Sequence, residues 1–137
     1  MKLTPCILLL MFFCSCGRRE KSATVKDDQL SVQAISVTEK DATISYKVRI
    51  FPDQKWKDKS NSQLGEKMRY HVDSCFYLLQ DNVSYYPESI MPIANGMSTN
   101  FEYLISFGPL PKEGSVERQL IYHDKYMSQK DYKLLLK

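Results

Sequence analysis

Among the side chains of this 137-residue chain, cysteines and histidines are the first candidates for covalent modification, metal binding or proton transfer. Two cysteines, Cys14 and Cys16, follow an apolar run from Leu3 to Phe13, and the sulfur of a cysteine at such a place can be modified covalently. The run is preceded by one cation, Lys2, and is shorter than the about 20 apolar residues that cross a bilayer as a helix. A basic start, a short apolar segment and small residues at a processing point are typical of a secretory signal. We therefore expect residues 1–15 to be removed as a signal peptide.

The segment Phe13-Cys14-Ser15-Cys16-Gly17 resembles the lipobox of bacterial lipoproteins, in which an aliphatic residue and two small residues precede an obligatory cysteine. The resemblance implies that Cys16 becomes the first residue, with a diacylglycerol on its sulfur and an acyl chain on its amino group. Cys14 fits the pattern less well, because Phe13 would stand where a small side chain is required. Two or more acyl chains hold a protein stably on a membrane.

The resemblance also implies a place in the cell. It indicates a bacterial cell envelope, and Gly17 after the lipidated cysteine indicates the outer membrane, with the protein facing the periplasm. The membrane is then one partner, reached through the covalent lipid on Cys16, and we expect no other cofactor.

Cys75 is the single thiol that these changes leave in the mature chain, because Cys6 and Cys14 lie in the signal and Cys16 is acylated. An internal disulfide is therefore excluded. Cys75 lies in the apolar stretch 74–78, and free cysteines are commonly buried as small apolar side chains. We expect Cys75 to be buried rather than reactive.

The two histidines, His71 and His123, form no recognisable catalytic or metal-binding pattern. A metal site needs at least three converging ligands, and no spacing in the chain calls for one. The sequence has no H-E-x-x-H motif, no nucleophile elbow and no phosphate-binding glycine loop. We expect surface histidines in cross-strand polar pairs, beside Arg69 and Asp73, in a protein that is not an enzyme.

The mature chain has the size of one domain. Its formal net charge is +2 once Lys2 has been removed, too small to suggest a nucleic-acid partner. The segment Gly17–Gln29 is polar, mixed in charge and without periodicity, which is typical of a linker. We expect residues 16–29 to be the lipidated N-terminus and a flexible linker, about 20 Å long as a coil and up to about 45 Å when extended. The folded domain is expected over residues 30–137.

From Leu30 onward, apolar and polar residues alternate with the period of half-buried strands. The alternation is clearest over Ala42–Phe51, and it slips at Ala34-Ile35, which predicts a β-bulge. A polar turn at residues 38–41 would make Leu30–Phe51 a hairpin. Further strands are expected over Met68–Leu79, Val83–Tyr86, Phe101–Phe107, Val116–His123 and Tyr132–Leu136, with a long loop over 52–66 that includes an edge segment or a turn of helix.

Short strands separated by Gly, Pro, Asn and Asp, with no convincing amphipathic helix, predict an all-β fold. We expect a two-sheet sandwich of seven or eight mostly antiparallel strands, with an immunoglobulin-like or a transthyretin-like topology.

Two segments are candidates for contact with a protein partner. One is the irregular apolar segment 85–93, which holds Tyr85, Tyr86 and Met91. Aromatic residues and methionine are enriched at interfaces, although packing over an open end of the sandwich would explain this segment as well. The other is the loop around Trp56, the only tryptophan, which lies among lysines. It could contact lipid headgroups or a partner, or it could be a solvated loop with a tucked-in tryptophan.

The leading hypothesis is a non-enzymatic envelope lipoprotein that binds a protein partner as a scaffold subunit of an envelope assembly. A lipobox followed by a small sandwich is similar to lipoprotein subunits of cell-envelope machines such as type VI secretion systems. The alternatives are an immunity or inhibitor lipoprotein that blocks an incoming hydrolase, and a glycan-binding lipoprotein.

Overall fold

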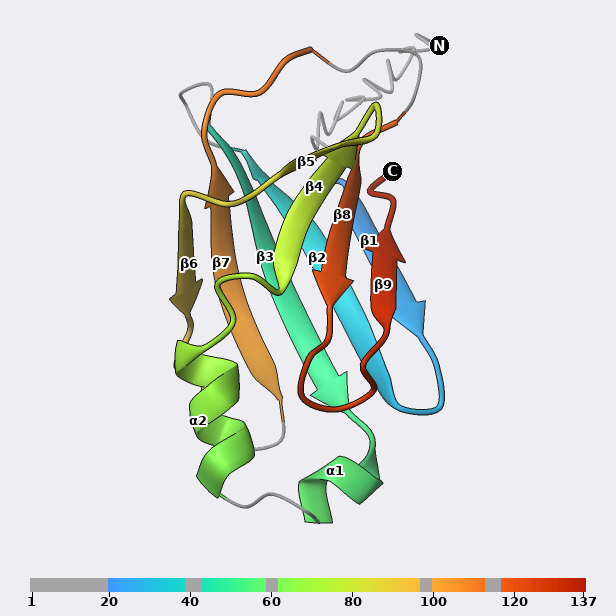
Figure 1. Ribbon diagram of the computed structural model, residues 1–137, viewed down its shortest axis with the longest axis vertical. Coiled ribbons are helices and arrows are strands. Elements are labelled where there is room, and N and C mark those ends of the chain that lie inside the picture. Colours follow the sequence, from blue (N-terminus) through green and yellow to red (C-terminus); the bar gives the residue numbers. More distant parts are fainter. Residues whose placement is uncertain (1–19, 39–42, 59–61, 97–99, 113–116) are drawn as a thin grey trace, which may run out of the picture.

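The computed structural model describes residues 20–38, 43–58, 62–96, 100–112 and 117–137, which form two packed antiparallel sheets (Figure 1). The predicted signal peptide, Cys16 and most of the predicted turn at 38–41 lie outside the described residues. In the described part, no helix is long and apolar enough to cross a membrane.

The sandwich consists of a five-stranded and a four-stranded sheet. The five-stranded sheet has the order β1 (Ser22–Lys26), β2 (Leu30–Thr38), β3 (Ile44–Pro52), β7 (Phe101–Phe107) and β6 (Ser89–Pro92). The four-stranded sheet has the order β5 (Val83–Tyr85), β4 (Phe76–Gln80), β8 (Gln119–His123) and β9 (Asp131–Leu134). Two helices, α1 (Gln54–Asp58) and α2 (Ser62–Tyr70), connect β3 to β4. The described residues thus hold nine strands, more than the predicted seven or eight.

Strands β2 to β9 follow the immunoglobulin order. In that fold, strands A, B, E and D form one sheet and strands C, F and G form the other, to which C′ can be added beside C. Here β2-β3-β7-β6 correspond to A-B-E-D, and β5-β4-β8-β9 correspond to C′-C-F-G. The predicted all-β two-sheet sandwich is confirmed, and its strand order is that of the immunoglobulin topology, with β1 as an additional strand beside the first.

β1 corrects the predicted linker. Residues 22–26 pair with residues 31–35 of β2, and Ala23 and Val25 pack against the core. These two apolar side chains alternate with polar ones, but the polar composition of the whole segment 17–29 hides so short a pattern. The folded domain therefore begins at Ser22 instead of Leu30. Only five residues separate it from Cys16, and they reach at most about 20 Å when extended.

The β2–β3 hairpin is confirmed, whereas the predicted bulge at Ala34-Ile35 is wrong. The two strands pair without interruption from Leu30 opposite Pro52 to Thr38 opposite Ile44. Ala34 is fully buried and Ile35 lies on the other face of the sheet. The slip in the sequence pattern arises because an apolar side chain stands on the outer face, and the backbone register is not shifted.

α2 replaces the start of the strand predicted over Met68–Leu79. Leu64 and Met68 are four residues apart and therefore lie on one face of a helix. Met68 is fully buried, and its carbonyl oxygen accepts a hydrogen bond from the Tyr103 hydroxyl. Alternate apolar positions after Met68 gave the segment the appearance of a strand, but β4 begins only at Phe76.

Aromatic rings fill the space between the sheets. Phe76 lies 5.0 Å from Tyr122 and 5.5 Å from Tyr103 between ring centroids, and all three side chains are fully buried or nearly so. Cys75 is buried beside them, which confirms the prediction, and burial raises the pKa of its thiol to about 11. The core holds the two sheets together without a disulfide among the described residues.

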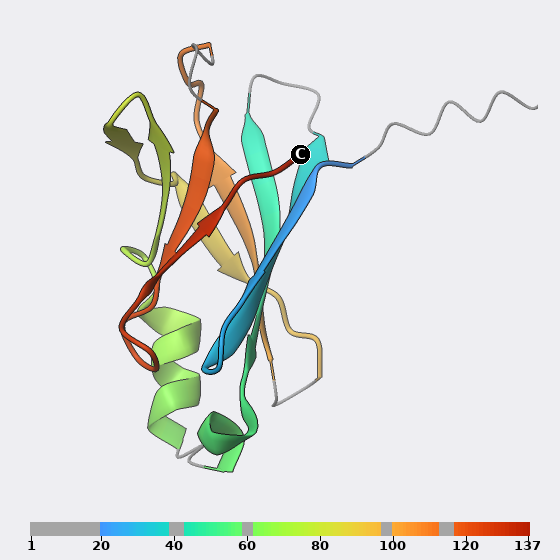
Figure 2. The same ribbon diagram turned by 90° about the vertical axis from the view of Figure 1, so that its right-hand side faces the viewer.

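The two ends of the sandwich differ. α1, α2, the β1–β2 turn and the β8–β9 loop lie at one end, whereas β1 begins and the chain ends at the other (Figure 1). Figure 2 shows the two sheets from the side, with β1 and β9 adjacent. At the start of β1, the Ser22 N–H donates a hydrogen bond to the carbonyl oxygen of Lys137, which follows β9, at 3.4 Å. We call the end that carries the two helices the helical end.

Asp27 connects the β1–β2 turn to β9 and its loop. Its carboxylate accepts hydrogen bonds from the N–H groups of Gln29 (2.8 Å) and Leu30 (3.1 Å). It also accepts hydrogen bonds from the Tyr132 hydroxyl (3.0 Å) and the Lys130 ammonium group (3.2 Å). Burial by itself would raise the pKa of Asp27, but these hydrogen bonds outweigh it and lower the pKa to about 2.

The first prediction concerns this carboxylate. Replacing Asp27→Asn should lower the free energy of unfolding by about 2 kcal/mol at pH 7, because a native pKa of about 2 against about 3.9 in the unfolded chain stabilises the fold. This stabilisation is complete above about pH 4 to 5 and is lost as the pH falls toward 2. Urea denaturation at several pH values measures it.

The matched control is Asp28→Asn, since Asp28 is 79% exposed and lies 3.9 Å from Lys130. It should change the stability by less than about 0.5 kcal/mol. A difference between wild type and Asp27→Asn that stays constant from neutral pH down to pH 2 would contradict the assignment.

Candidate functional site

The four predicted contact residues do not form one surface. Tyr85 lies opposite Leu78 in β4 and packs against the core. Tyr86, the next residue, is 61% exposed, and its ring contacts the ring of Tyr77 on the outer face of the four-stranded sheet. Met91 lies on the other sheet, in β6, so the segment predicted as irregular contains an edge strand. Trp56 is part of α1, at the helical end.

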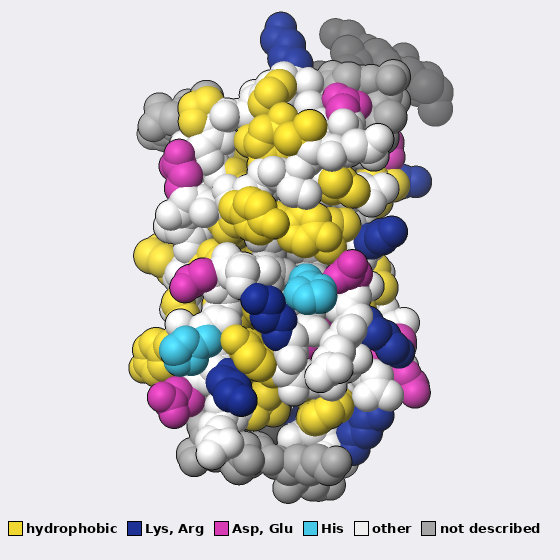
Figure 3. Space-filling view, viewed as in Figure 1, with side chains coloured by type: hydrophobic (Ala, Val, Ile, Leu, Met, Phe, Trp, Pro, Cys, Tyr) yellow, Lys and Arg dark blue, Asp and Glu magenta, His cyan; other side chains and the backbone are white. Residues whose placement is uncertain are grey.

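The first candidate surface is the aromatic face, which consists of Tyr77, Leu79, Tyr86 and Ile121 on the outer side of the four-stranded sheet. The rings of Tyr77 and Tyr86 lie 5.9 Å apart between centroids. Ile121 lies opposite Tyr77 and is only 1% exposed, although it is on the outer side. Hydrophobic side chains gather over the upper part of this sheet in Figure 3. The side chains of the aromatic face therefore pack on each other and leave Tyr86 protruding.

Polar groups border the aromatic face. His123 and Asp131 are cross-strand neighbours, with 2.6 Å between His Nδ1 and Asp Oδ1, and each is nearly half exposed. The predicted polar pairing of a surface histidine thus holds for His123, whereas His71 follows α2 and lies on no strand. Burial and the negative charge of Asp131 raise the pKa of Tyr77, which places its hydroxyl near this polar border.

The outer face of the five-stranded sheet is different in character. Glu102 is 7% exposed and forms ion pairs with Lys47 (2.7 Å) and Arg49 (3.4 Å). Burial would raise the pKa of Glu102, but the Lys47 hydrogen bond and the Arg49 charge lower it overall. The hydroxyls of Ser45 and Ser106 are 2.9 Å apart. The polar groups of this face are thus largely satisfied by one another.

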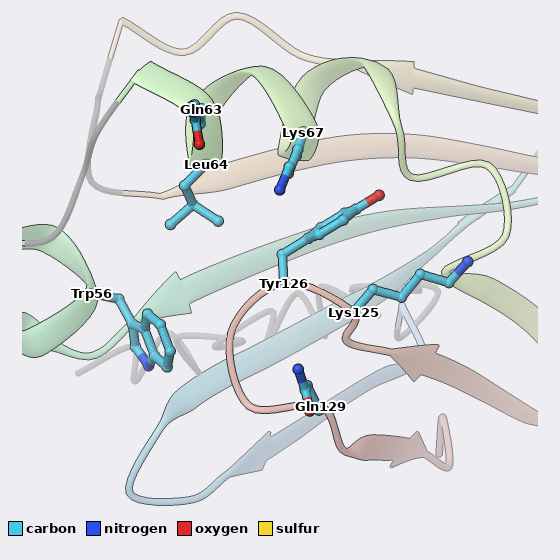
Figure 4. A pocket seen from close by; sticks show the side chains of 7 residues that line it. All are labelled: Trp56, Gln63, Leu64, Lys67, Lys125, Tyr126 and Gln129. Atoms are coloured by element: carbon cyan, nitrogen blue, oxygen red, sulfur yellow. The ribbon is translucent and has the colours of Figure 1, made fainter.

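The second candidate surface is a cleft of about 400 Å³ at the helical end (Figure 4). Three segments supply its side chains: Trp56 from α1, then Gln63, Leu64 and Lys67 from α2, and Lys125, Tyr126 and Gln129 from the β8–β9 loop. Figure 4 shows the ammonium group of Lys67 turned toward the Tyr126 ring, and the distance to the ring centroid is 5.7 Å. We call this cleft the helical-end cleft.

The buried carboxylate of Asp124 holds the β8–β9 loop in place. It is fully buried and accepts a hydrogen bond from the Tyr122 hydroxyl, at 3.0 Å. It also accepts hydrogen bonds from the N–H groups of Tyr126 (3.2 Å) and Met127 (3.4 Å). The N–H and hydroxyl of Ser128 donate two more, at 2.5 and 2.8 Å. A buried carboxylate with this many donors keeps a loop in one conformation.

Further contacts position the cleft side chains. The Tyr126 hydroxyl donates to the His71 carbonyl oxygen at 2.5 Å, and the Lys125 ammonium group donates to the Ser74 hydroxyl. Gln129 has a φ of 57°, a left-handed conformation that is uncommon outside glycine. Both walls of the cleft, α2 and the loop, are therefore tied to each other and to the turn before β4.

The described side chains of the cleft offer groups that can bind a ligand. Aromatic faces, amides and ammonium groups line it, and no nucleophile stands beside a general base in that set. Within the described ranges, no three His, Cys, Asp or Glu side chains converge on a point where a metal could bind. The cleft lies where the B–C and F–G connections of the immunoglobulin order meet, the end that carries binding loops in antibody variable domains.

Sequence reasoning found Trp56 and Tyr86 but missed the residues around them. The alternation in 76–80 was visible, so Tyr77 could have been placed on the outer face beside Tyr86. Lys67 and Tyr126 are 59 positions apart in the chain, and no local signal connects them. Comparisons with protein-family models, with curated proteins and with solved structures found no match.

The second prediction tests Asp124 as the support of the loop. Replacing Asp124→Ala should lower the free energy of unfolding by about 3 kcal/mol, because it leaves several buried donors without an acceptor. Denaturation in urea at pH 7 measures this value. Asp131→Ala, a half-exposed carboxylate in the same region, is the control and should cost at most about 1 kcal/mol. Equal losses of unfolding free energy for the two substitutions would show that the hydrogen bonds of Asp124 do not stabilise the loop.

Proposed function

We propose that this chain is a lipid-anchored protein of the bacterial envelope that binds a protein partner through the aromatic face and performs no catalysis. It acts as a scaffold subunit of an envelope assembly, of the kind found in secretion machines. The observation that carries the proposal is the exposed Tyr86, packed on Tyr77 over an otherwise complete sandwich. The lipobox-like segment that ends at Cys16 supports the anchor.

The short connection to the anchor supports a subunit that stays near the membrane. Acyl chains on Cys16 would lie five residues before Ser22, so the start of β1 is held within about 20 Å of the lipid. β2 alone has nine residues and is about 30 Å long. The anchor thus holds the β1 end of the domain near the membrane and leaves the helical end and the outer face of the four-stranded sheet free to contact neighbouring molecules.

The aromatic face has the composition of an interface. Interface cores are enriched in tyrosine and depleted of charge, and their rims are polar; here His123 and Asp131 form such a rim beside Tyr77. Tyr86 is exposed and Tyr77 and Leu79 are partly exposed beside it, and contiguous apolar patches commonly mark a binding surface.

Addition of a partner strand to β6 is a weaker route to the same function. β6 is short and is an edge strand within the described part of the sheet. Pro87 precedes it and Pro92 ends it, and proline has no N–H to offer to a pairing strand. Such prolines are a common protection of sheet edges. We therefore expect side chains, not backbone pairing, to bind the partner.

The third prediction tests the anchor. Mature wild-type protein should carry a diacylglyceryl group and an acyl chain on an N-terminal Cys16 and should stay with membranes after extraction with carbonate. Intact-protein mass spectrometry of the membrane and soluble fractions measures both. Cys14→Ala should leave processing and lipidation unchanged, whereas Cys16→Ala should abolish the lipid. An unacylated wild-type chain, or lipid on Cys14, would contradict the assignment.

The fourth prediction tests the aromatic face. A photoreactive amino acid placed at Tyr86 should crosslink to one envelope protein in intact cells, and the same residue placed at Met91 should not. The captured protein is identified by mass spectrometry, purified and titrated with the protein in detergent. Tyr77→Ser and Tyr86→Ser should each weaken its binding at least about tenfold, as expected for buried aromatic contacts, while Met91→Ser leaves it unchanged.

The identity of the captured protein separates the two protein-binding functions. A subunit of an envelope assembly supports the scaffold function, whereas a secreted hydrolase would show an immunity or inhibitor protein instead. Equal crosslinking from positions 86 and 91, or binding that neither tyrosine substitution affects, would refute the aromatic face as the binding surface.

A further inference from the structure

We infer that the helical-end cleft binds an acidic saccharide, at a site separate from the aromatic face. The site needs no protein partner, and only its position relative to a membrane rests on the proposed anchor at Cys16.

The positive charge of the lining side chains favours a negatively charged ligand. Of the residues that the structure describes, Lys67 and Lys125 both line the cleft, and no acidic side chain among them does. The nearest carboxylate in the loop, Asp124, is fully buried and is occupied by donors from its own loop. Lys67 is the cation turned into the cleft, whereas the ammonium group of Lys125 points away from the centre (Figure 4). An anionic group would therefore bind beside Lys67, by a charge-assisted hydrogen bond.

The remaining lining side chains select the shape of the ligand. Trp56 and Tyr126 present ring surfaces from opposite sides of the cleft, with Leu64 between them (Figure 4). Flat apolar rings suit the C–H faces of sugar rings, and the primary amides of Gln63 and Gln129 can both donate to and accept from hydroxyl groups. A volume of about 400 Å³ lies within the range of small-ligand sites. A sugar ring that carries a carboxylate uses all of these groups.

The cleft is organised before any ligand arrives. The hydrogen bonds of Asp124 fix the loop, and the Tyr126 hydroxyl is held by the carbonyl oxygen of His71. Lys67 lies over the Tyr126 ring. A preorganised site loses little conformational entropy on binding, so few contacts are enough for measurable affinity.

The position of the cleft argues against a lipid headgroup as the ligand. The helical end is opposite the end at which β1 begins (Figure 1), about 30 Å away along the strands. In a chain tethered at Cys16, the cleft is therefore at the end of the domain farther from the anchor, where envelope polymers can reach it.

The fifth prediction uses Trp56 as its own reporter, because it is the only tryptophan in the chain and it lines the cleft. Titration of the detergent-purified mature protein with tetragalacturonic acid or a hyaluronan tetrasaccharide should change the Trp56 fluorescence saturably for at least one of them. The neutral tetrasaccharide chitotetraose and the acidic peptide tetraglutamate should each bind at least about tenfold more weakly. Chitotetraose has no negative charge for Lys67, and tetraglutamate has no sugar rings to lie against the aromatic side chains.

Two matched lysine variants make the test specific. Lys67→Gln should raise the dissociation constant at least about tenfold, whereas Lys133→Gln, an exposed lysine on β9 outside the cleft, should not change it. Thermal unfolding confirms that both variants are folded. The inference is overturned by no saturable response to either acidic saccharide, by equally tight binding of tetraglutamate or chitotetraose, or by equal affinities of the two variants.

Discussion

The pairing of β1 with β2 is the interaction on which the rest of the structure depends. It adds a fifth strand to the A-B-E-D sheet and covers the outer edge of β2. The turn after β1 places the Asp27 carboxylate within hydrogen-bond distance of Tyr132 and Lys130. The first strand is therefore connected to the last across the open side of the sandwich. A segment that composition assigns to a linker is thus part of the folded domain and closes the fold.

The same pairing gives the molecule a direction. Its first strand begins at the end that also holds the C-terminus, and the two helices with the β8–β9 loop lie at the other end. A lipid on Cys16 would fix the first end to a membrane and leave the second end free. The aromatic face lies between them, on the side of the four-stranded sheet, so anchor, protein contact and ligand cleft would occupy separate parts of one small domain.

Much of the fold could be predicted from alternation, because half-buried strands have a period of two. That period gave the β2–β3 hairpin, β7 and the sandwich class. It failed at β1, where two small apolar residues stand among charges, and at α2, where Met68 fits a helical and a strand pattern equally well. The candidate sites were harder to predict. Trp56 and Tyr86 were found by residue type, but the cleft depends on the meeting of α2 with a loop 59 positions away, and Asp124 matters only because the fold buries it.

Native-state hydrogen exchange of the mature chain tests the central claim most directly. If residues 22–26 are a strand of the sandwich, their amides that bond to β2 should exchange as slowly as those between β2 and β3, and through the same opening. Exchange of the Ala23 and Val25 amides at the rate of an unstructured peptide, while β3 stays protected, would contradict the claim. The domain would then begin at Leu30, on a long flexible tether.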